Sequence, residues 1–325
     1  MTETLQELAR AIARELAAAD VARGGPPAKQ STAAPQNHPH QLIADPIISA
    51  SDSPPASAPW PSAPPRGVTF VRENARIADF IDHTLLKAEA TAREIDALCD
   101  EAREHRFAAI CVNPAWVRRC ADRLLGTSVQ VATVIGFPLG ANRSETKRDE
   151  AALAVANGAT ELDMVAAIGH IKTGDWHHVA DDIAAVVEGA AGTLVKVIIE
   201  SASLSPVEII KTCAIAREMR AQYVKSSTGF HPAGGASAEA IALMRMVVGD
   251  AMGVKASGGV RDCDAALRMI ASGATRIGTS SGVSMVKCLG QGPLPLHDLL
   301  SLASRHTSSC ATCVHPSGGP ATATY

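Results

Sequence analysis

Five charged side chains lie in segments of the chain that otherwise have the composition of buried strands. They are Asp82 in FIDHT, Asp163 in ELDMVA, Lys196 in LVKVIIE, Lys225 in YVKSST and Lys255 in GVKASG. Parallel strands that are buried on both faces normally consist of continuous Val, Ile and Leu. Burying an ammonium group is costly unless it is paired or loses its charge. The repeated lysines therefore predict one functional cluster rather than three separate side chains whose ammonium groups reach the solvent.

Clustered lysines beside an aspartate suit covalent chemistry at a carbonyl carbon. Each ammonium group disfavours the charge of its neighbours, so the pKa values of the lysines are expected to fall. A neutral lysine can attack a carbonyl and form an iminium, which then acts as an electron sink. A cationic lysine and the carboxylate of Asp163 would move the protons. This chemistry needs no metal or other cofactor, and on residue type alone Lys196, Lys225 or Lys255 could each be the nucleophile.

Two glycine-rich segments predict a phosphate site. KASGGVRD contains Gly258 and Gly259, and RIGTSSGVS contains Gly278, Ser280 and Ser281. Each segment follows a predicted strand and precedes a predicted helix, and backbone N–H groups at helix N-termini bind anions. Loops after the seventh and eighth strands of a parallel barrel often bind phosphate. Ordinary tight turns are the alternative interpretation of these glycines.

The elements that must position these residues alternate regularly between strand and helix. Helical segments separate eight short apolar runs, which cover residues 79–84, 108–112, 129–137, 161–166, 194–200, 223–228, 253–258 and 275–280. Such alternation predicts a parallel sheet with right-handed crossovers. Eight units predict an α/β fold, a closed (β/α)8 TIM barrel, within a domain at residues 67–289. An open doubly wound sheet is the alternative, but the first strand lacks a Gly-x-Gly-x-x-Gly turn.

Three segments outside the barrel have a different composition. Residues 1–23 carry an apolar stripe at helical spacing and predict an amphipathic helix. Residues 24–66 are rich in Pro, Ala and Ser and predict a linker, so the N-terminal extension is expected to be disordered. Residues 290–325 are expected to form a flexible C-terminal tail. A helix held away from the barrel by a long linker is expected to bind a partner surface; fraying or packing on the barrel are the alternatives.

Composition excludes several classes of protein. The 325 residues include 30 Lys and Arg against 33 Asp and Glu, and this balance lacks the positive field of a nucleic-acid-binding protein. No apolar run is long enough for a membrane span, and no secretory leader is recognisable. The eight cysteines are scattered, which suits a reducing cytoplasm. Cys310 and Cys313 cannot complete a four-ligand zinc site by themselves, and the barrel histidines lack paired ligand spacing, so no metal site is predicted.

Taken together, these segments resemble the deoxyribose-phosphate aldolase family, which comprises class I aldolases. The resemblance covers most of residues 77–289, and the matching blocks follow the family's order: IDHTLLKAEAT, CVNPAWV, VIGFPLGA, GATELDMVAAIG, LVKVIIE, VKSSTGF, GVKASGGVRD and RIGTSSG. It implies reversible cleavage of 2-deoxy-D-ribose 5-phosphate to D-glyceraldehyde 3-phosphate and acetaldehyde. It also implies that Lys225 forms the Schiff base, that Lys255 lowers its pKa and relays protons, and that Asp163 donates and accepts protons.

The same resemblance assigns further residues to the site. It implies a supporting role for Lys196 and for Tyr325, the latter because some members carry a catalytic tyrosine at the end of a mobile tail; a chance tyrosine at a disordered end is the alternative. Asp82, Thr84 and Cys111 are further predicted supporting residues, Cys111 because it lies near the top of the second predicted strand, with a buried small apolar side chain as the alternative. The implied phosphate-contacting residues are Gly229, Gly258, Gly259, Gly278, Ser280 and Ser281. The chain departs from the family pattern at Ser226, Ala167 and Phe230. A homodimer or homotetramer is expected. A Schiff-base aldolase or transaldolase acting on another sugar phosphate is the alternative activity.

The N-terminal helix and linker resemble the encapsulation peptides that load enzymes into bacterial microcompartments. Under this hypothesis, residues 3–22 bind a shell protein and the cytoplasmic enzyme is enclosed with its volatile aldehyde. A mitochondrial transit peptide is the rival interpretation, but Glu3, Glu7, Glu15 and Asp20 are unusual for that class.

Overall fold

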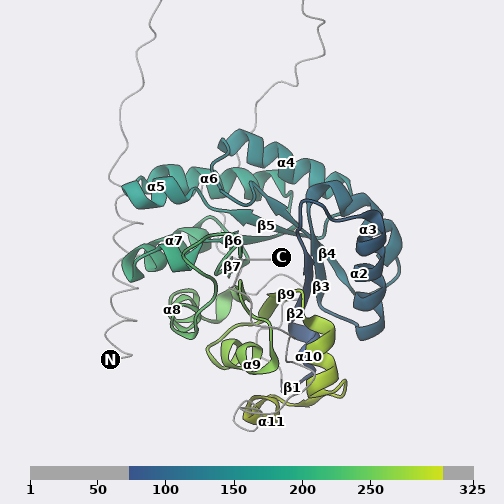
Figure 1. Ribbon diagram of the computed structural model, residues 1–325. Coiled ribbons are helices and arrows are strands. Elements are labelled where there is room, and N and C mark those ends of the chain that lie inside the picture. Colours follow the sequence, from purple (N-terminus) through teal and green to yellow (C-terminus); the bar gives the residue numbers. More distant parts are fainter. Residues whose placement is uncertain (1–72, 303–325) are drawn as a thin grey trace, which may run out of the picture.

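A computed structural model describes residues 73–302 of the chain. Its centre is a closed barrel of eight parallel strands, in which β9 pairs with β2 to complete the ring (Figure 1). All eight predicted strands are present, and the predicted (β/α)8 TIM barrel is confirmed. The strands are β2 (Ile81–Leu85), β3 (Ala109–Val112), β4 (Gln130–Ile135), β5 (Glu161–Val165), β6 (Leu194–Ile198), β7 (Tyr223–Lys225), β8 (Gly253–Ser257) and β9 (Arg276–Thr279).

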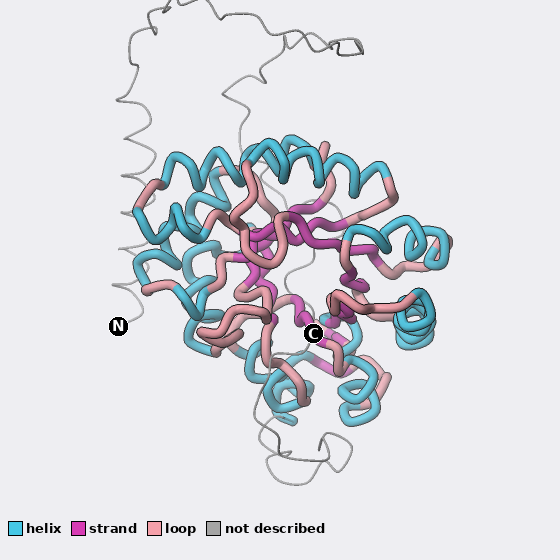
Figure 2. Tube along the Cα trace, turned by 45° about the horizontal axis from the view of Figure 1, so that its top comes forward, coloured by secondary structure: helices cyan, strands magenta, loops and turns pink. Residues whose placement is uncertain are grey.

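Helices surround the strands on all sides of the barrel (Figure 2). They are α2 (Ala92–His105), α3 (Val117–Leu124), α4 (Ser144–Ala156), α5 (Ile168–Thr173), α6 (Trp176–Gly189), α7 (Pro206–Glu218), α8 (Ala238–Val248), α9 (Cys263–Ala271), α10 (Gly282–Leu289) and α11 (Leu296–Ser301). Local sequence explains where several of them begin. Thr91 and Glu94 form a capping box at α2, and Ser205 and Glu208 form another at α7, where Pro206 occupies the first helical position.

The strands separate two apolar regions. A large core lies between the strands and the helices and includes Ile110 and Val112, whereas a small cluster joins Ala109 and Cys111 with three other buried residues. Successive side chains of a strand point to opposite faces. Cys111 therefore faces the barrel interior, where small side chains leave room for the long charged ones.

A buried ion pair joins the helices that flank β5. Lys147 on α4 donates to Asp182 on α6 at 2.7 Å and to the carbonyl of Val165 at 2.9 Å, and both charged side chains are fully buried. The hydrogen bonds compensate for the lost hydration of the two charges. They also fix the carboxyl end of β5 between α4 and α6.

The described structure continues beyond the last barrel helix. β1 (Asn74–Ala75) pairs antiparallel with β10 (Leu294–Pro295), and α11 packs against α9. The boundary predicted at residue 290 is therefore wrong, because residues 290–302 pack against the barrel. A two-residue strand has no recognisable periodicity, which explains why the sequence pattern did not predict it.

Several predictions fall on residues outside the described range. These are the helix at 1–23, the linker at 24–66, the shell-binding segment at 3–22, the pair Cys310 and Cys313, and Tyr325. They stay predictions. Within residues 73–302, no helix has the length and apolar character that crossing a membrane requires.

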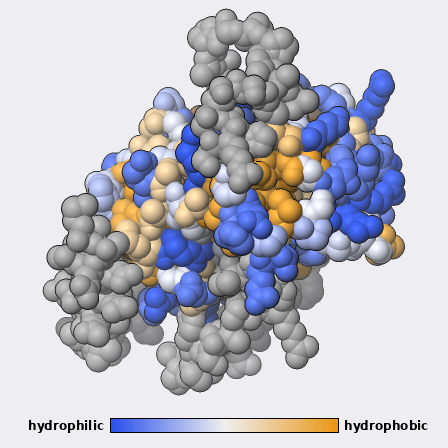
Figure 3. Space-filling view, turned by 90° about the horizontal axis from the view of Figure 1, so that it is seen from below, coloured by the Kyte–Doolittle hydropathy of each residue, from blue (hydrophilic) through white to orange (hydrophobic). Residues whose placement is uncertain are grey.

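The surface is not uniform in polarity. On the face drawn in Figure 3, apolar residues gather near the middle and hydrophilic residues dominate the right side. That side corresponds to α2 and α3, whose outer surfaces carry the ion pairs Arg119–Asp96 and Arg123–Asp100. Exposed ion pairs of this kind contribute little to stability but keep the helix surface hydrated.

Candidate active site

The barrel brings the three predicted lysines together around one carboxylate. The carboxylate of Asp163 on β5 accepts from Lys225 on β7 at 2.8 Å, from Lys255 on β8 at 2.7 Å and from Lys196 on β6 at 2.7 Å. Lys225 and Lys255 contact the same oxygen, Oδ2, whereas Lys196 contacts Oδ1. All four side chains are buried. Strand register explains the convergence, because Asp163 is paired with Lys196 and Lys225 is paired with Lys255.

A second group of charges lies beside this cluster. Lys255 contacts Asp82 at 2.5 Å, and Lys196 contacts Glu161 at 2.6 Å. Arg276 on β9 bridges the two acids: it donates to Asp82 at 2.5 Å and to both carboxylate oxygens of Glu161 at 2.9 and 3.1 Å. The barrel interior thus contains one continuous network of charges.

The charges of this network do not balance when every lysine is protonated. The three carboxylates are those of Asp82, Glu161 and Asp163, and the cations other than Lys225 are Lys196, Lys255 and Arg276. These six groups neutralise one another. A protonated Lys225 would add a fourth buried positive charge, and such a charge is costly in a low-dielectric interior.

The pKa values follow this charge balance. Burial lowers the pKa of Lys225 below its ordinary value, and the cation of Lys255 lowers it further, although Asp163 opposes both effects. Burial also disfavours the charge of Lys255, but Asp163 and Asp82 outweigh it and raise the pKa of Lys255. Asp163 and Glu161 raise the pKa of Lys196 against the same cost of burial. Lys225 is therefore the lysine of this cluster that the site drives towards neutrality.

This outcome corrects one expectation. Mutual repulsion was expected to lower the pKa of every lysine in the cluster, but the pKa values of Lys196 and Lys255 are raised because each has two close carboxylate partners. The expectation holds for Lys225 alone among the three. Geometry thus distinguishes Lys225 from its two neighbours, which residue types alone could not do.

The carboxylates at the centre are held in their charged form. Burial opposes the charge of Asp163, but the three lysines lower its pKa well below the ordinary value. Burial likewise opposes the charge of Asp82, and Arg276 and the nearby lysines lower its pKa to about 2. These carboxylates therefore stay charged and accept hydrogen bonds from the ammonium groups around them.

Two other predicted supporting residues lie close to the cluster. The thiol of Cys111 on β3 is 4.0 Å from Oδ2 of Asp163, and burial together with that carboxylate raises its pKa. The thiol is therefore held in its neutral form. Thr84 on β2 is buried, and its hydroxyl donates to the carbonyl of Asp82 at 2.8 Å. That bond supports the backbone beside Asp82.

The predicted phosphate residues lie on three neighbouring strand ends. Gly229 follows β7, Gly258 and Gly259 follow β8, and Ser280 and Ser281 follow β9. All three glycines have positive φ, between 80° and 86°, a backbone conformation that glycine adopts without strain. Gly259 and Ser280 are exposed, and Ser281 is the N-cap of α10. The residues therefore converge on one edge of the barrel mouth.

Gly278 differs from the other predicted phosphate residues. It lies within β9 and is buried, paired with Asp82 on one side and with Ser257 on the other. A Cβ at this position would come within 2.9 Å of Cβ of Ser257 and 3.1 Å of Cε of Lys255. The absence of a side chain here makes room for Lys255.

Three charged residues of the site were not recognised from the sequence. Glu161 and Arg276 stand at the starts of predicted strands, where a charge is normally solvent-exposed, so nothing marked them. Glu200 ends the LVKVIIE block, is fully buried and has a left-handed backbone with φ of 57°. A buried carboxylate after a strand is the signal that could have identified it.

Glu200 organises the segment that follows Lys225. Its carboxylate accepts from the hydroxyl of Ser227 at 2.5 Å and from the hydroxyl of Thr228 at 2.6 Å, and it also accepts from the backbone N–H of Thr228. Ser227 in turn accepts from the N–H of Gly229 at 3.0 Å. One buried acid therefore fixes the backbone between Lys225 and Gly229, the first predicted phosphate residue.

The positions that depart from the family pattern fit the site without strain. Ser226 accepts from the N–H of Ser257 at 3.1 Å and donates to its carbonyl at 3.1 Å, so the hydroxyl links β7 to β8. Ala167 is buried and is the N-cap of α5. Phe230 packs edge-on against Phe137 with ring centroids 5.2 Å apart.

A parallel barrel with a buried lysine of lowered pKa, which shares a carboxylate oxygen with a second lysine of raised pKa, has the architecture of a barrel aldolase. Residues 76–287 match the family described as DeoC/LacD family aldolase, and the chain belongs to this family.

Known proteins of similar sequence agree with this assignment. The chain is 56% identical over 216 residues to the deoxyribose-phosphate aldolase of Brevibacillus brevis, and the match covers 66% of this chain and 97% of that protein. It is 52% identical over 220 residues to the deoxyribose-phosphate aldolase of Thermotoga maritima, covering 67% of this chain and 88% of that protein.

Solved structures have the same fold. A putative deoxyribose-phosphate aldolase from Coccidioides immitis is 39% identical with a TM-score of 0.64, and the match covers 70% of this chain and 91% of that one. The deoxyribose phosphate aldolase of Aeropyrum pernix, described as a unique tetrameric structure, is 31% identical with a TM-score of 0.61, covering 65% and 89%.

Proposed function

We propose that the protein cleaves 2-deoxy-D-ribose 5-phosphate reversibly to D-glyceraldehyde 3-phosphate and acetaldehyde, through a Schiff base on Lys225. The observation that carries this proposal is the lowered pKa of Lys225 beside a carboxylate oxygen that it shares with the cationic Lys255. The similarity to deoxyribose-phosphate aldolases supports the choice of substrate.

The first half of the reaction forms the iminium. The neutral amine of Lys225 attacks C1 of the open-chain aldehyde, and the resulting carbinolamine loses its hydroxyl as water after protonation. Asp163 Oδ2 lies 2.8 Å from Nζ of Lys225 and 2.7 Å from Nζ of Lys255. The cationic Lys255 can therefore supply, through Asp163, the proton that the departing hydroxyl needs, without involving groups outside the buried network.

The second half breaks the carbon–carbon bond. A base, assigned to Asp163, removes the proton from the C3 hydroxyl, the C2–C3 bond breaks, and its electron pair moves to the iminium nitrogen. D-glyceraldehyde 3-phosphate leaves, and an enamine remains on Lys225. Protonation of the enamine at C2 by the Asp163–Lys255 pair regenerates an iminium, and water then releases acetaldehyde and the free lysine.

The phosphate is assigned to the edge of the barrel mouth above β7, β8 and β9. The proposed donors are the backbone N–H groups of Gly258 and Gly259 and the N-terminus of α10 after Ser281, and they need no metal ion. Gly229 lies beside them, with its own N–H bonded to Ser227. Binding energy from this remote group would hold C1 of the substrate against Lys225. Lys196 is assigned a supporting role, since it stabilises the charge of Asp163 and stays protonated.

A borohydride trap tests this assignment directly. The protein is incubated with 2-deoxy-D-ribose 5-phosphate, reduced with sodium borohydride and digested, and the peptides are mapped by mass spectrometry. We expect one reduced adduct, on Lys225, because a protonated lysine cannot attack the aldehyde. Lys225→Met should abolish the adduct, and turnover should fall by about 10⁴-fold or more with loss of the covalent route.

The controls separate the chemistry from the assignment of roles. Lys172 lies on the exposed part of α5, so Lys172→Met should leave both the adduct and the turnover unchanged. An adduct on Lys196 or Lys255 would keep the Schiff base but contradict the choice of nucleophile. A folded protein that gives no adduct would contradict the proposed substrate.

We extend the proposal to assembly and location. A homodimer or homotetramer agrees with the tetrameric structure described for the Aeropyrum pernix enzyme. The resemblance of residues 3–22 to an encapsulation peptide supports binding to a microcompartment shell protein in the cytoplasm. Enclosure would retain acetaldehyde, which is volatile and reactive.

A further inference from the structure

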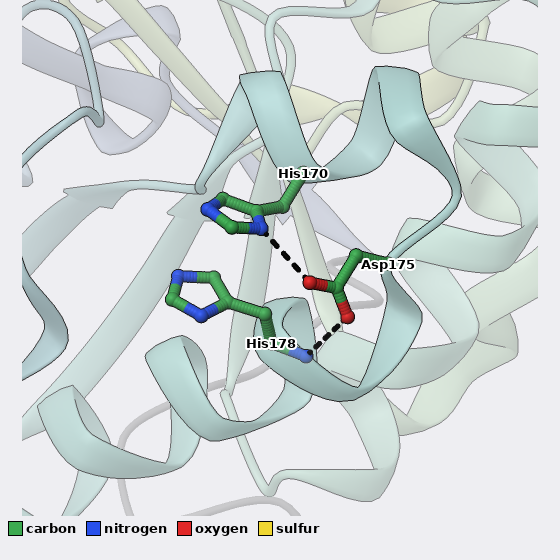
Figure 4. A group of neighbouring side chains, drawn as sticks. All are labelled: His170, Asp175 and His178. Carbon is green, nitrogen blue, oxygen red and sulfur yellow. Dashed lines mark hydrogen bonds and ion pairs between the residues drawn. The ribbon is translucent and has the colours of Figure 1, made fainter.

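A group of three potential metal ligands lies outside the barrel interior, in the turn between α5 and α6. His170 stands in the last turn of α5, Asp175 is the N-cap of α6, and His178 follows in the first turn of α6 (Figure 4). One ligand atom from each residue lies within 4.8 Å of the others. The sequence did not predict this pairing, because the residues become neighbours only when Gly174, with φ of 75°, reverses the chain.

We propose that His170, Asp175 and His178 form a surface site for a divalent transition-metal ion such as Zn²⁺. Two imidazoles and one carboxylate are the ligands that Zn²⁺ and its neighbours in the first transition row prefer, whereas Mg²⁺ and Ca²⁺ prefer oxygen ligands alone. The side chains of His170 and Asp175 are 45% and 48% exposed. An ion bound here would therefore complete its coordination shell with water.

The distance between His170 and Asp175 is close to the spacing of two ligands of one metal ion. Nδ1 of His170 is 3.1 Å from Oδ2 of Asp175. Zinc–nitrogen and zinc–oxygen bonds of about 2 Å at tetrahedral angles put two ligand atoms about 3.3 Å apart. A metal ion can therefore replace the proton between these two atoms while both side chains stay close to their present positions.

The ring of His178 supplies the third ligand. It is stacked on the ring of His170, with centroids 3.6 Å apart and an angle of 19° between the planes. Stacked rings do not direct their lone pairs at one point, so the ring of His178 must rotate about its side-chain bonds. The ring is only partly buried, so the rotation displaces water rather than core side chains.

The helix cap at α6 is compatible with a bound metal. Oδ1 of Asp175 accepts from the backbone N–H of His178 at 3.2 Å, which leaves Oδ2 for the metal. The cap uses only the backbone of His178, and its imidazole is not needed there. A metal ion would join the end of α5 to the start of α6, in the connection that directly follows the strand of Asp163. We therefore expect binding to stabilise the fold.

The test is a Zn²⁺ titration of the untagged full-length chain by isothermal calorimetry, after treatment with a chelator. Cys310→Ser and Cys313→Ser are introduced throughout, so that the thiols cannot bind the metal. Asp175→Asn is the most informative variant, because Asn caps a helix as well as Asp but lacks the negative charge. We expect it to leave the melting temperature of the metal-free protein unchanged and to weaken Zn²⁺ binding about tenfold or more.

Further variants and a matched control complete the design. His170→Gln and His178→Gln should each weaken Zn²⁺ binding about tenfold or more, whereas His177→Gln on the same helix turn should not. Zn²⁺ should raise the melting temperature of the parent protein, and an equal concentration of Mg²⁺ should not. Parent protein that binds no Zn²⁺, or Asp175→Asn and His178→Gln variants that bind it with parental affinity, would overturn the proposal.

Discussion

Lys225 differs from the other two buried lysines in its carboxylate partners. In the part of the chain that the structure describes, Lys225 forms an ion pair with Asp163 alone, whereas Lys255 also contacts Asp82 and Lys196 also contacts Glu161. Shared acids hold Lys196 and Lys255 in the cationic form. Burial and the positive charge of Lys255 thus act together to lower the pKa of Lys225.

The pH dependence of imine formation should reveal whether Lys255 lowers the pKa of Lys225. A protonated lysine is not nucleophilic, so the rate rises with pH through the pKa of Lys225 and levels off above it. Lys255→Met removes the cation that lowers this pKa and leaves Asp163 to pair more strongly with Lys225. We expect the rise in rate to move to higher pH, measured by quenching the reaction with borohydride at short times.

Lys255→Arg provides the matched comparison. It keeps the positive charge, so the rise in imine formation should stay near the pH observed for the unaltered protein. A Lys255→Met variant whose rate rises at the same pH as the unaltered protein would show that Lys255 does not control the pKa of Lys225.

At the scale of elements, the interface of β8 and β9 controls the position of Lys255. Gly278→Ala would introduce a Cβ 3.1 Å from Cε of Lys255 and 2.9 Å from Cβ of Ser257. We expect kcat to fall about 100-fold, because a displacement of about 1 Å at a reacting group has costs of this size. Crowding should also lower the free energy of unfolding by about 1–3 kcal/mol.

Steady-state kinetics and thermal unfolding check this prediction together. Gly169→Ala on α5 is the control, since a Cβ there meets no atom within 4 Å. It should change neither kcat nor stability appreciably. Gly278→Ala with normal kcat would mean that Lys255 has more freedom than the close contacts suggest.

Glu200, in the connection between β6 and α7, holds the start of the connection between β7 and α8 in place. Glu200→Gln keeps one acceptor but places an amide group against the hydroxyls of Ser227 and Thr228. We expect KM for 2-deoxy-D-ribose 5-phosphate to rise about tenfold, since a buried hydrogen bond to a charged group contributes about 1.5–3 kcal/mol.

The comparison with unphosphorylated 2-deoxy-D-ribose gives this prediction its specificity. If Glu200 acts by positioning the segment Ser227–Gly229 for phosphate binding, the variant should lose preference for the phosphorylated substrate. The value of kcat/KM for the free sugar should then change little. Glu239→Gln, on the exposed side of α8, should alter neither value. An equal loss for both substrates would indicate a general effect on the barrel.

At the scale of the whole molecule, the described barrel contains every predicted site residue except Tyr325. Residues 73–302 provide eight complete strands and all the charged residues of the network. Deleting residues 1–25 should therefore leave kcat and KM unchanged within about twofold while co-purification with microcompartment shell proteins is lost. Continued co-purification would contradict the encapsulation hypothesis, and a large loss of activity would indicate that the helix packs on the barrel.

Sequence predicted the barrel and the centre of the site for identifiable physical reasons. Alternating strand and helix patterns are repeated eight times, and lysines within apolar strands are anomalous, so both signals stand out. Arg276 and Glu161 carried no such signal, because they are distant in the chain and only the closed barrel brings them together. Similarly, the pKa difference between Lys225 and Lys255 depends on register across strands, which residue types do not specify.

The pairing of β1 with β10 has a consequence for the order of the elements along the chain. Asn74 pairs with Pro295 and Ala75 with Leu294, so the two ends of the described region lie side by side. A circular permutant could join these ends and open the chain elsewhere. One such place is Gly192 between α6 and β6, where an added Cβ would meet no atom within 4 Å. The turn at Gly192 precedes β6, so it lies at the end of the barrel opposite the mouth to which the phosphate is assigned. The linear order of this barrel is thus one of several that would preserve the same catalytic network.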